Sequence, residues 1–428
     1  MRFNFISETA DGFGMAFRIM QEGNPVRMWI HDPEAIAIGD NMIPKVGDLE
    51  DLVHDAKVGD DIFILDTSGN GVLADGLRAR GYSVLGGGTI QDRLEKDRKF
   101  ALKVMEEVRI KTPDTVSFSD FDQAIEFAKA TKDRMVYKPS KRLGEMSPSL
   151  VTHDQVDLIE LLENLKAKIT IADPQFELQT FVKGLEVSSE GWFDGVRWLP
   201  MFNHTFERKQ LMDGNLGPSG GCTGNVVWAC DGECPICRAG IRKMERFLRE
   251  NNFRGMIDLN AIVTEEAVYG LEFTPRFGYD ASPTLMWQLL RGELGQLYAD
   301  LATGQRIPQS PFREGFATAV KITIPPWPTE KYTAEAEVPI RGIAPEDLED
   351  IYWYNIKSGS RLADFVSAGA WGIICLATGF GKSIKSAFKK PYEVAEGIRL
   401  PDKQYRLDLE KQFSENFLEL SALVEQYA

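Results

Sequence analysis

The first ninety residues alternate short apolar runs with amphipathic segments. Three runs are rich in β-branched and aromatic residues and predict strands, at residues 2–6, 26–30 and 61–66. Two intervening segments carry apolar residues at helical spacing and end on glycine, at residues 11–23 and 72–81. Strands that alternate with helices in this way predict a parallel, doubly wound sheet.

Beyond residue 90 the pattern is mixed. Residues 90–108 predict one charged amphipathic helix. Residues 175–195 predict two strands with a kink at a glycine, and residues 252–278 predict a β-hairpin. After residue 311 we expect short strands and then a long polar helix at the end of the chain.

Length, charge and cysteine content limit the class of protein. A chain of 428 residues is too long for a single core, so two or three domains are expected. The formal net charge of -15 argues against general nucleic-acid binding, because that requires clustered Lys and Arg. Apolar runs such as GAWGIICLA are far shorter than the roughly 20 residues of a membrane span. Five cysteines without an N-terminal signal segment predict reduced thiols and a cytoplasmic protein.

Two carboxylates stand in the predicted hairpin, Asp258 in MIDLNAIV and Glu272 in GLEFTPRF. Antiparallel pairing would bring them together on one face of a sheet, where they repel unless a cation lies between them. Hard oxygen ligands suit Mg²⁺, which also prefers bound phosphates. Asn260 shares the side-chain parity of Asp258, and Arg276 offers a planar cation to a phosphate oxygen. A solvated hairpin with a structural ion pair explains the same spacing equally well.

Lys138 ends an apolar strand predicted at residues 134–140, so its ammonium is expected at the sheet edge. Lys141 and Arg142 follow in the turn KPSKRLGE, and three cations in a turn can hold a polyphosphate. An exposed basic turn is the alternative. Glu186 comes after a strand and a kink, where a carboxylate can accept the hydroxyls of a ribose, although most such glutamates are simply solvated.

Residues 213–225, DGNLGPSGGCTGN, predict a long loop whose backbone amides could close over an anion. Four of the five cysteines lie in or soon after it: Cys222, Cys230, Cys234 and Cys237. They include one CxxC, which is typical of zinc and redox sites, but lack the repeated CxxC of a zinc ribbon. Incidental thiols are therefore favoured over zinc at this cluster, and none of the four histidines is assigned a role.

The order of these motifs resembles the ATP-grasp superfamily and, more narrowly, the phosphoribosylamine–glycine ligase family, over nearly the whole chain. The sequence LEFTPRFGYDASPT is similar to the strand EFNxRFGDPE of that family. The segment DGNLGPSGGCTG is similar to its loop DGDxGPNTGGMG, LQTFVKGLE to its hinge EEFLxGxE, and ERKQ to its DHKR.

The resemblance implies an α/β ATP-grasp fold in three parts. Residues 1–90 would form the N-terminal doubly wound parallel-sheet domain. Residues 91–310 would form the ATP-grasp domain, whose part 91–185 includes the ATP lid. Residues 311–428 would form a C-terminal α+β domain of the ligase type.

The resemblance also assigns roles to residues by their position. Glu272 would bind Mg²⁺ together with Asp258, since Thr274 stands where the family has a metal-binding asparagine. The residues expected to bind ATP are Arg98, Lys138, Lys141, Glu186 and the backbone around Gln179 and Val182. Arg276 and Lys209 are expected to act on the transferring phosphoryl group. The residues expected to bind the substrate are Asp213, Gly217 and Ser219.

The activity implied is an amide-forming, ADP-producing carbon–nitrogen ligase of the kind used in purine biosynthesis. It would use ATP with Mg²⁺ or Mn²⁺, take a small carboxylate such as glycine or another amino acid together with an amine, and be a monomer or dimer. Residues 7–17 and 65–71 depart from the segments that hold phosphoribosylamine in the family. A ligase for another amine, for example on a modified nucleotide, therefore stays open. A nucleotide-binding protein without catalysis stays open because of Thr274.

Overall fold

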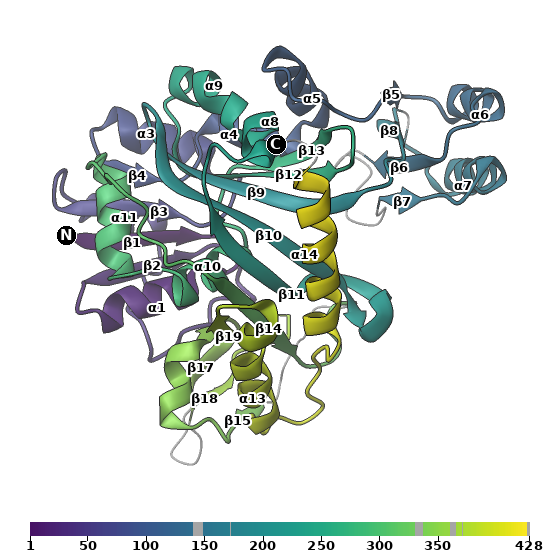
Figure 1. The fold of residues 1–428 in the computed structure, drawn as a ribbon. Coiled ribbons are helices and arrows are strands. Elements are labelled where there is room, and N and C mark those ends of the chain that lie inside the picture. The colour runs from purple at the N-terminus through teal and green to yellow at the C-terminus, as the bar shows by residue number, and fades with distance from the viewer. Residues whose placement is uncertain (140–148, 172, 330–336, 360–364, 370, 426–428) are drawn as a thin grey trace.

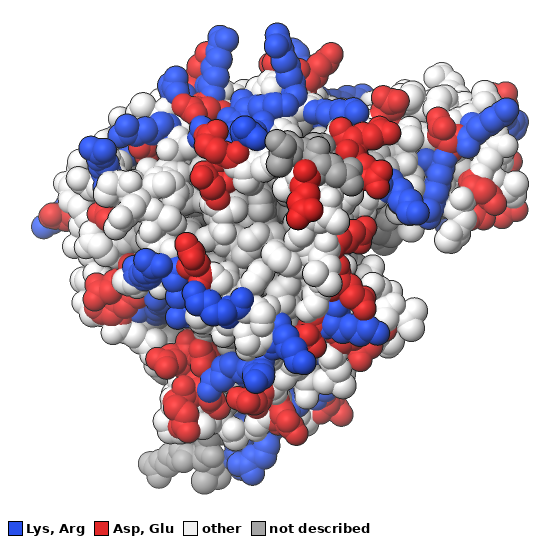
Figure 2. All heavy atoms as spheres, viewed as in Figure 1, with Lys and Arg blue, Asp and Glu red and all other residues white. Residues whose placement is uncertain are grey.

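The protein is described by a computed structural model. It covers residues 1–139, 149–171, 173–329, 337–359, 365–369 and 371–425. Among these residues no helix is both long and apolar enough to cross a membrane. The surface view shows Lys and Arg interspersed with Asp and Glu, so the face shown presents no continuous basic area (Figure 2).

The N-terminal region is a four-stranded parallel sheet in the order β2-β1-β3-β4 (Figure 1). Its strands are β1 (Arg2–Ser7), β2 (Val26–Ile30), β3 (Asp61–Leu65) and β4 (Ser83–Leu85). The connecting helices are α1 (Phe13–Gln21), α2 (Leu49–His54) and α3 (Gly71–Ala79). All five residues of β3 are buried, as expected for a parallel strand covered on both faces. The predicted doubly wound region is confirmed.

A second, small sheet projects from the molecule on the right of Figure 1. Its order is β5-β8-β6-β7, with strands β5 (Thr115–Phe118), β6 (Met135–Pro139), β7 (Leu150–Val151) and β8 (Phe176–Thr180). Helices α6 (Phe121–Ala130) and α7 (Gln155–Lys168) pack together on it and enclose a separate hydrophobic core. We call this sheet with its two helices the lid sheet. Its side chains pack in a core of their own, separate from the main hydrophobic core.

The centre of the molecule is an eight-stranded antiparallel sheet in the order β13-β12-β9-β10-β11-β14-β19-β16. Its first five strands in chain order are β9 (Leu185–Asp194), β10 (Trp198–Met212), β11 (Leu216–Cys230), β12 (Arg254–Val263) and β13 (Val268–Thr274). The C-terminal region adds β14 (Phe316–Thr323), β16 (Ile351–Trp353) and β19 (Ile373–Gly381). The sheet thus continues without a break across the boundary predicted at residue 310.

The remaining elements surround this sheet. The helices are α4 (Thr89–Lys96), α5 (Arg98–Glu107), α8 (Pro235–Ala239), α9 (Glu245–Glu250), α10 (Ala281–Gln288), α11 (Leu294–Thr303), α12 (Ile384–Ala387), α13 (Lys389–Gly397) and α14 (Leu409–Glu425). The short 3₁₀ turns are η2 (Asp213–Asn215), η3 (Ile241–Met244) and η4 (Pro345–Asp350). A further small sheet joins β15 (Pro339–Ile340), β18 (Phe365–Ser367) and β17 (Ile356–Ser358).

Two expectations about local structure are wrong. Residues 213–225 are not a long loop: they form the tip and most of the second strand of the β10–β11 hairpin. Cross-strand pairing overrides the low strand propensity of glycine and proline there. Residues 90–108 form two helices, because Asp97 has an extended backbone and its side chain accepts the Phe100 N–H at the start of α5.

Asp66 lies where the N-terminal sheet changes winding direction, just after β3. The Ser7 hydroxyl and the Gly12 N–H both donate to its Oδ2, at 2.5 and 2.6 Å. The residue is 2 % exposed. Burial, and then the neighbouring Asp11, raise the pKa of Asp66 to about 7. The folded state therefore binds this proton more tightly than the unfolded state.

We expect the contribution of Asp66 to the free energy of unfolding to fall as pH rises from about 4 to about 7, and to stay constant above. Asp66→Asn should remove this dependence, so the variant should be more stable than the wild type above pH 7, by on the order of a few kcal/mol. Urea unfolding at a series of pH values measures the difference. Asp60→Asn, at an exposed position before the same strand, is the matched control for loss of a charge. Equal pH dependence in the wild type and Asp66→Asn would contradict the assignment.

Candidate active site

A cavity of about 550 Å³ opens where the N-terminal sheet, the central sheet and the C-terminal strands meet. Thr9 and Asp11 come from the N-terminal region. Lys321 and Tyr354 come from the C-terminal region. The floor comes from β9, β10, β12 and β13. All three parts of the chain are needed to enclose the cavity.

Side-chain alternation along the central strands gathers the polar residues of the floor on one face. The register places Asp258 beside Glu190 on one side and Thr274 on the other. Asn260 is paired with Glu272. The two carboxylates predicted to share a face, Asp258 and Glu272, do line the same cavity, but as diagonal neighbours rather than as a direct pair.

The floor concentrates negative charge. Asp258 is 8 % exposed, and burial followed by the charges of Glu190 and Glu207 raises its pKa well above the usual range. Burial and the charge of Asp280 raise the pKa of Glu207 to about 7. Among the described residues, Asp258 Oδ1, Glu190 Oε2 and Asn260 Oδ1 are buried without a hydrogen-bond partner. Such a set of carboxylate and amide oxygens fits a hard divalent cation such as Mg²⁺.

Arg276 enters the cavity from the turn after β13 and is held firmly. Its Nε and Nη2 donate to Glu95 Oε1 of α4 at 3.3 and 3.2 Å. Its guanidinium lies 4.0 Å from the centroid of the Tyr279 ring. The planar cation is therefore fixed in orientation beside the acidic floor.

Lys209 and Glu186 form an ion pair of 2.7 Å at the edge of the floor, and Asn260 Nδ2 also donates to Glu186, at 2.9 Å. Burial opposes ionisation of Glu186, but the Lys209 ammonium holds its pKa below the ordinary value. Burial likewise opposes the charge of Lys209, but Glu186 raises the pKa of this lysine. Both groups are thus charged and close to the carboxylates of the floor.

A second cavity of about 460 Å³ lies between α5 and the lid sheet, and it is lined by Arg98, Lys138 and Glu177 among others. Arg98 Nε lies 3.6 Å from Glu177 Oε2. Burial, and then the charge of Arg98, lower the pKa of Lys138 to about 8, while Glu272 and Glu177 counteract this shift. The influence of Glu272 places Lys138 within electrostatic range of the first cavity. Lys141 lies outside the described residues.

Of the two residues whose backbone is expected to hydrogen-bond adenine, only Val182 lies outside a strand. Gln179 lies in the middle of the lid sheet, paired with Val136 on one side and Thr115 on the other, and its side chain donates to Thr115 Oγ1. Its backbone groups therefore belong to the strand ladder. Val182 follows β8, in the connection to β9, outside that ladder.

The three residues predicted on the substrate side do not line the cavity. Asp213 lies at the tip of the β10–β11 hairpin, where its Oδ1 accepts the Leu407 N–H at 2.9 Å. Gly217 and Ser219 are on the first part of β11. The same strand enters the cavity wall slightly later, at Gly220, Gly221 and Cys222.

Sequence reasoning missed the C-terminal wall. Lys321 and Asp280 form a buried ion pair of 2.8 Å, and the Tyr354 hydroxyl donates to Asp280 Oδ1 at 2.8 Å. One signal was available, because Lys321 is the only charged residue in the apolar run FATAVKITI. Glu190 and Glu207 carried no comparable signal, since each is one acid in a strand of mixed character.

The cysteine cluster also differs from the expectation. Cys222 lines the active-site cavity and is separate from the other three. Cys230, Cys234 and Cys237 gather with His204 instead. The membership predicted from sequence is therefore wrong in one residue, and it lacks the histidine.

Known proteins resemble this chain over most of its length. Residues 96–281 match the family model for the ATP-grasp (A) domain of phosphoribosylglycinamide synthetase. The phosphoribosylamine–glycine ligase of Clostridium acetobutylicum is 23 % identical over 358 residues, which cover 79 % of this chain and 82 % of that protein.

Solved structures show the same fold. The phosphoribosylamine–glycine ligase of Thermotoga maritima superposes with a TM-score of 0.71 at 18 % identity, covering 95 % of this chain and 99 % of that one. The biotin carboxylase domain of the Hydrogenobacter thermophilus 2-oxoglutarate carboxylase, solved with ADP, its magnesium salt and bicarbonate, gives a TM-score of 0.63 at 12 % identity, covering 100 % and 98 %. The chain therefore has the ATP-grasp fold and resembles phosphoribosylamine–glycine ligase.

Glu95 is expected to stabilise the site through Arg276. Glu95→Gln should lower the free energy of unfolding by about 1–3 kcal/mol, because it removes the charge that compensates a largely buried guanidinium. Chemical denaturation measures this loss. Glu107→Gln is the matched control, since Glu107 forms an exposed pair of 3.7 Å with Lys103 on the next helix, and its loss should cost less than about 0.5 kcal/mol. Equal losses in the two variants would show that Glu95 does not support Arg276.

Proposed function

We propose that this chain is an ATP-dependent carboxylate–amine ligase that forms an amide through an acyl phosphate. One observation carries the proposal. The cavity of an ATP-grasp fold brings Asp258 and Glu272 together with Lys209 and Arg276, and Lys138 lies within electrostatic range. Acids that can hold a divalent cation, next to cations that can hold phosphate, suit phosphoryl transfer.

The chemistry has two steps. A carboxylate oxygen of the first substrate attacks the γ-phosphorus of ATP, and the bond from that phosphorus to the β–γ bridging oxygen breaks, which gives an acyl phosphate and ADP. The amine nitrogen of the second substrate then attacks the acyl carbon, inorganic phosphate leaves, and the nitrogen releases a proton to solvent. The protein mainly holds the reactants in position and neutralises charge.

Each residue of the site would have a role set by its position: binding the metal ion, the phosphates or the ribose. Asp258 and Glu272 would hold Mg²⁺, with Asn260 as a neutral oxygen ligand, and the ion when bound neutralises charge on the phosphates. Arg276, fixed by Glu95, would contact the phosphoryl group during transfer. Lys138 and Arg98 would bind the phosphates from the lid side. Glu186 would accept a ribose hydroxyl once it exchanges its bond to Lys209.

The charges that line the cavity also bear on which amine is the acceptor. In the part of the chain that the structure describes, six carboxylates and three cations line the cavity: Asp11, Glu190, Glu207, Asp258, Glu272 and Asp280, with Lys209, Arg276 and Lys321. An acceptor that carries a phosphate would meet Asp11 at the N-terminal wall, where a like charge costs on the order of a kcal/mol at a partly exposed site, less the part offset by Arg276 and Lys321, whose charges act on the same carboxylate. A cationic or hydroxyl-rich amine suits this wall better. We therefore propose an acceptor other than phosphoribosylamine, with glycine or another small amino acid as the carboxylate.

Replacement of Glu272 tests the metal role. Glu272→Gln should lower kcat by at least about 100-fold while nucleotide binding weakens far less, since the lost charge matters most as the γ-phosphoryl group separates. ADP release measures kcat, and calorimetry with a non-hydrolysable ATP analogue and Mg²⁺ measures binding. Glu266→Gln, in the exposed turn of the same hairpin, is the matched control and should keep full activity. Nucleotide binding by the wild type without ADP release for any substrate pair would instead favour a protein without catalysis.

A substrate panel tests the acceptor. Amino acids are combined with phosphoribosylamine or with nonphosphorylated amines, and turnover is scored by ADP release and by the mass of the amide. We expect a nonphosphorylated amine to give the higher kcat/KM. A value for phosphoribosylamine of about 10⁴ M⁻¹s⁻¹ or more would contradict the proposed acceptor and leave the ligase assignment intact.

A further inference from the structure

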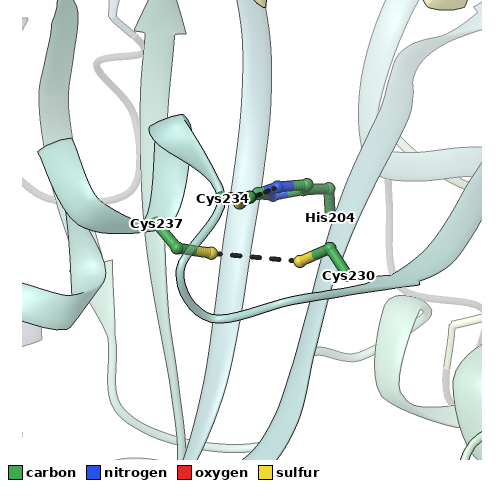
Figure 3. A group of neighbouring side chains, drawn as sticks. All are labelled: His204, Cys230, Cys234 and Cys237. Atoms are coloured by element: carbon green, nitrogen blue, oxygen red, sulfur yellow. Dashed lines mark hydrogen bonds between the residues drawn. The ribbon is translucent and has the colours of Figure 1, made fainter. Parts of the chain in front are cut away.

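Three cysteines and one histidine form a compact group (Figure 3). Side-chain alternation along β9 and β10 puts this group on the side of the central sheet opposite to the active-site cavity. His204 is on β10, Cys230 ends β11, and Cys234 and Cys237 are at the start of α8. Their ligand atoms, His Nε2 or Nδ1 and the three Sγ, all lie within 4.8 Å of one another. No part of this group belongs to the residues that line the cavity.

The distances fit a tetrahedral metal centre rather than disulfides. Cys230 Sγ and Cys237 Sγ are 3.9 Å apart, and His204 Nε2 is 3.3 Å from Cys234 Sγ. Zinc bonds of about 2.3 Å to sulfur and about 2.0 Å to nitrogen would put two sulfurs about 3.8 Å apart and a nitrogen about 3.5 Å from a sulfur. A disulfide would need sulfurs about 2.05 Å apart, and all three cysteines are free.

The surroundings orient the histidine as a ligand. The Ser189 hydroxyl lies 2.9 Å from His204 Nδ1 and is buried. With the proton on Nδ1 donated to Ser189 Oγ, the lone pair of Nε2 points to the sulfurs. Histidine ligands of metals commonly have such a second hydrogen bond, which fixes the tautomer and the ring.

A cross-link here would join short elements that otherwise depend on packing against the core. Helix α8 has only five residues, and η3 and α9 after it have four and six, so none of them is stable through helix propensity alone. The turn before α8 is closed by the Cys234 N–H donating to Asp231 O at 3.0 Å and by the Glu233 N–H donating to Asp231 Oδ1 at 2.9 Å. This turn brings Cys234 and Cys237 back onto the end of β11.

We propose that His204, Cys230, Cys234 and Cys237 bind one structural Zn²⁺ that fastens the α8 segment to the far face of the central sheet. Three sulfurs and one imidazole complete a tetrahedral shell without a position for substrate, and this ligand set suits zinc. This replaces the expectation of incidental thiols. The proposal does not depend on the ligase activity.

Metal analysis tests the site. The full chain, expressed without a polyhistidine tag and desalted after mild chelation, should retain about one zinc per chain by plasma mass spectrometry. Cys237→Ala and His204→Ala should lose most of this zinc and melt at a lower temperature. Cys375→Ala, which changes a buried cysteine on β19 away from the cluster, is the matched control and should keep the metal.

A second readout remains useful if a ligand variant fails to fold. Zinc is removed from the wild type by thiol-reactive reagent and reducing agent, and Co²⁺ is added. We expect the strong visible bands of tetrahedral, thiolate-bound cobalt. Less than about 0.1 zinc per chain together with no cobalt bands would overturn the proposal, because a closed thiolate site binds both ions. A Cys234–Cys237 disulfide found by alkylation and mass spectrometry in protein purified without reductant would overturn it in favour of a redox pair.

Discussion

The alternation of side chains along the central antiparallel strands is the constraint on which the rest of the structure depends. On β9, Ser188 and Glu190 face the acidic cavity, whereas Ser189 between them faces His204 on the other side. Consecutive residues of one strand therefore serve two separate sites. A register slip of one residue in β9 would move Glu190 into the packed face and Ser189 into the cavity, so both sites depend on the same pairing.

The second constraint is the balance of buried charge. Asp258, Glu190 and Glu207 stand close together in a largely buried floor, and burial is the main cause of their raised pKa values, to which neighbouring carboxylates add for Asp258 and Glu207. The cations of the cavity are each tied to a carboxylate at its margin, Arg276 to Glu95 and Lys321 to Asp280. A bound divalent cation would offset the negative charge of the floor, and this supports the proposal that the cavity takes a metal–nucleotide complex.

Much of this architecture could be predicted from local pattern. Apolar strands with alternating helices gave the N-terminal sheet, and the hairpin with Asp258 and Glu272 could be recognised from two strands and a polar turn. The stretch from Asp213 to Asn225 could not, because its glycines and proline indicate a loop whereas pairing with β10 and β14 makes it a strand. Propensity is local, and sheet pairing is decided by distant partners.

Prediction of the site residues was likewise limited to those that lie in local sequence motifs. Lys138, Lys209 and Arg276 follow recognisable local motifs, but Lys321 and Tyr354 reach the cavity only because the C-terminal strands extend the central sheet. His204 joins the cysteines because it lies diagonally across the β10–β11 ladder from Cys230. No spacing along the chain reveals such a neighbour.

The cavity is lined both by the N-terminal sheet region and by strands more than 300 residues later in the sequence, and this has a consequence for biosynthesis. Tyr352 donates its hydroxyl to the backbone oxygen of Asp11 at 2.6 Å, and Arg406 reaches back to Gln210 and Asn215 at the hairpin tip. A chain emerging from the ribosome can form the N-terminal sheet and the lid early, because each has its own core. Its cavity wall is completed only by segments translated after β13. A message cut short before β14 would therefore yield a product with the Asp258–Glu272 hairpin but without an enclosed cavity.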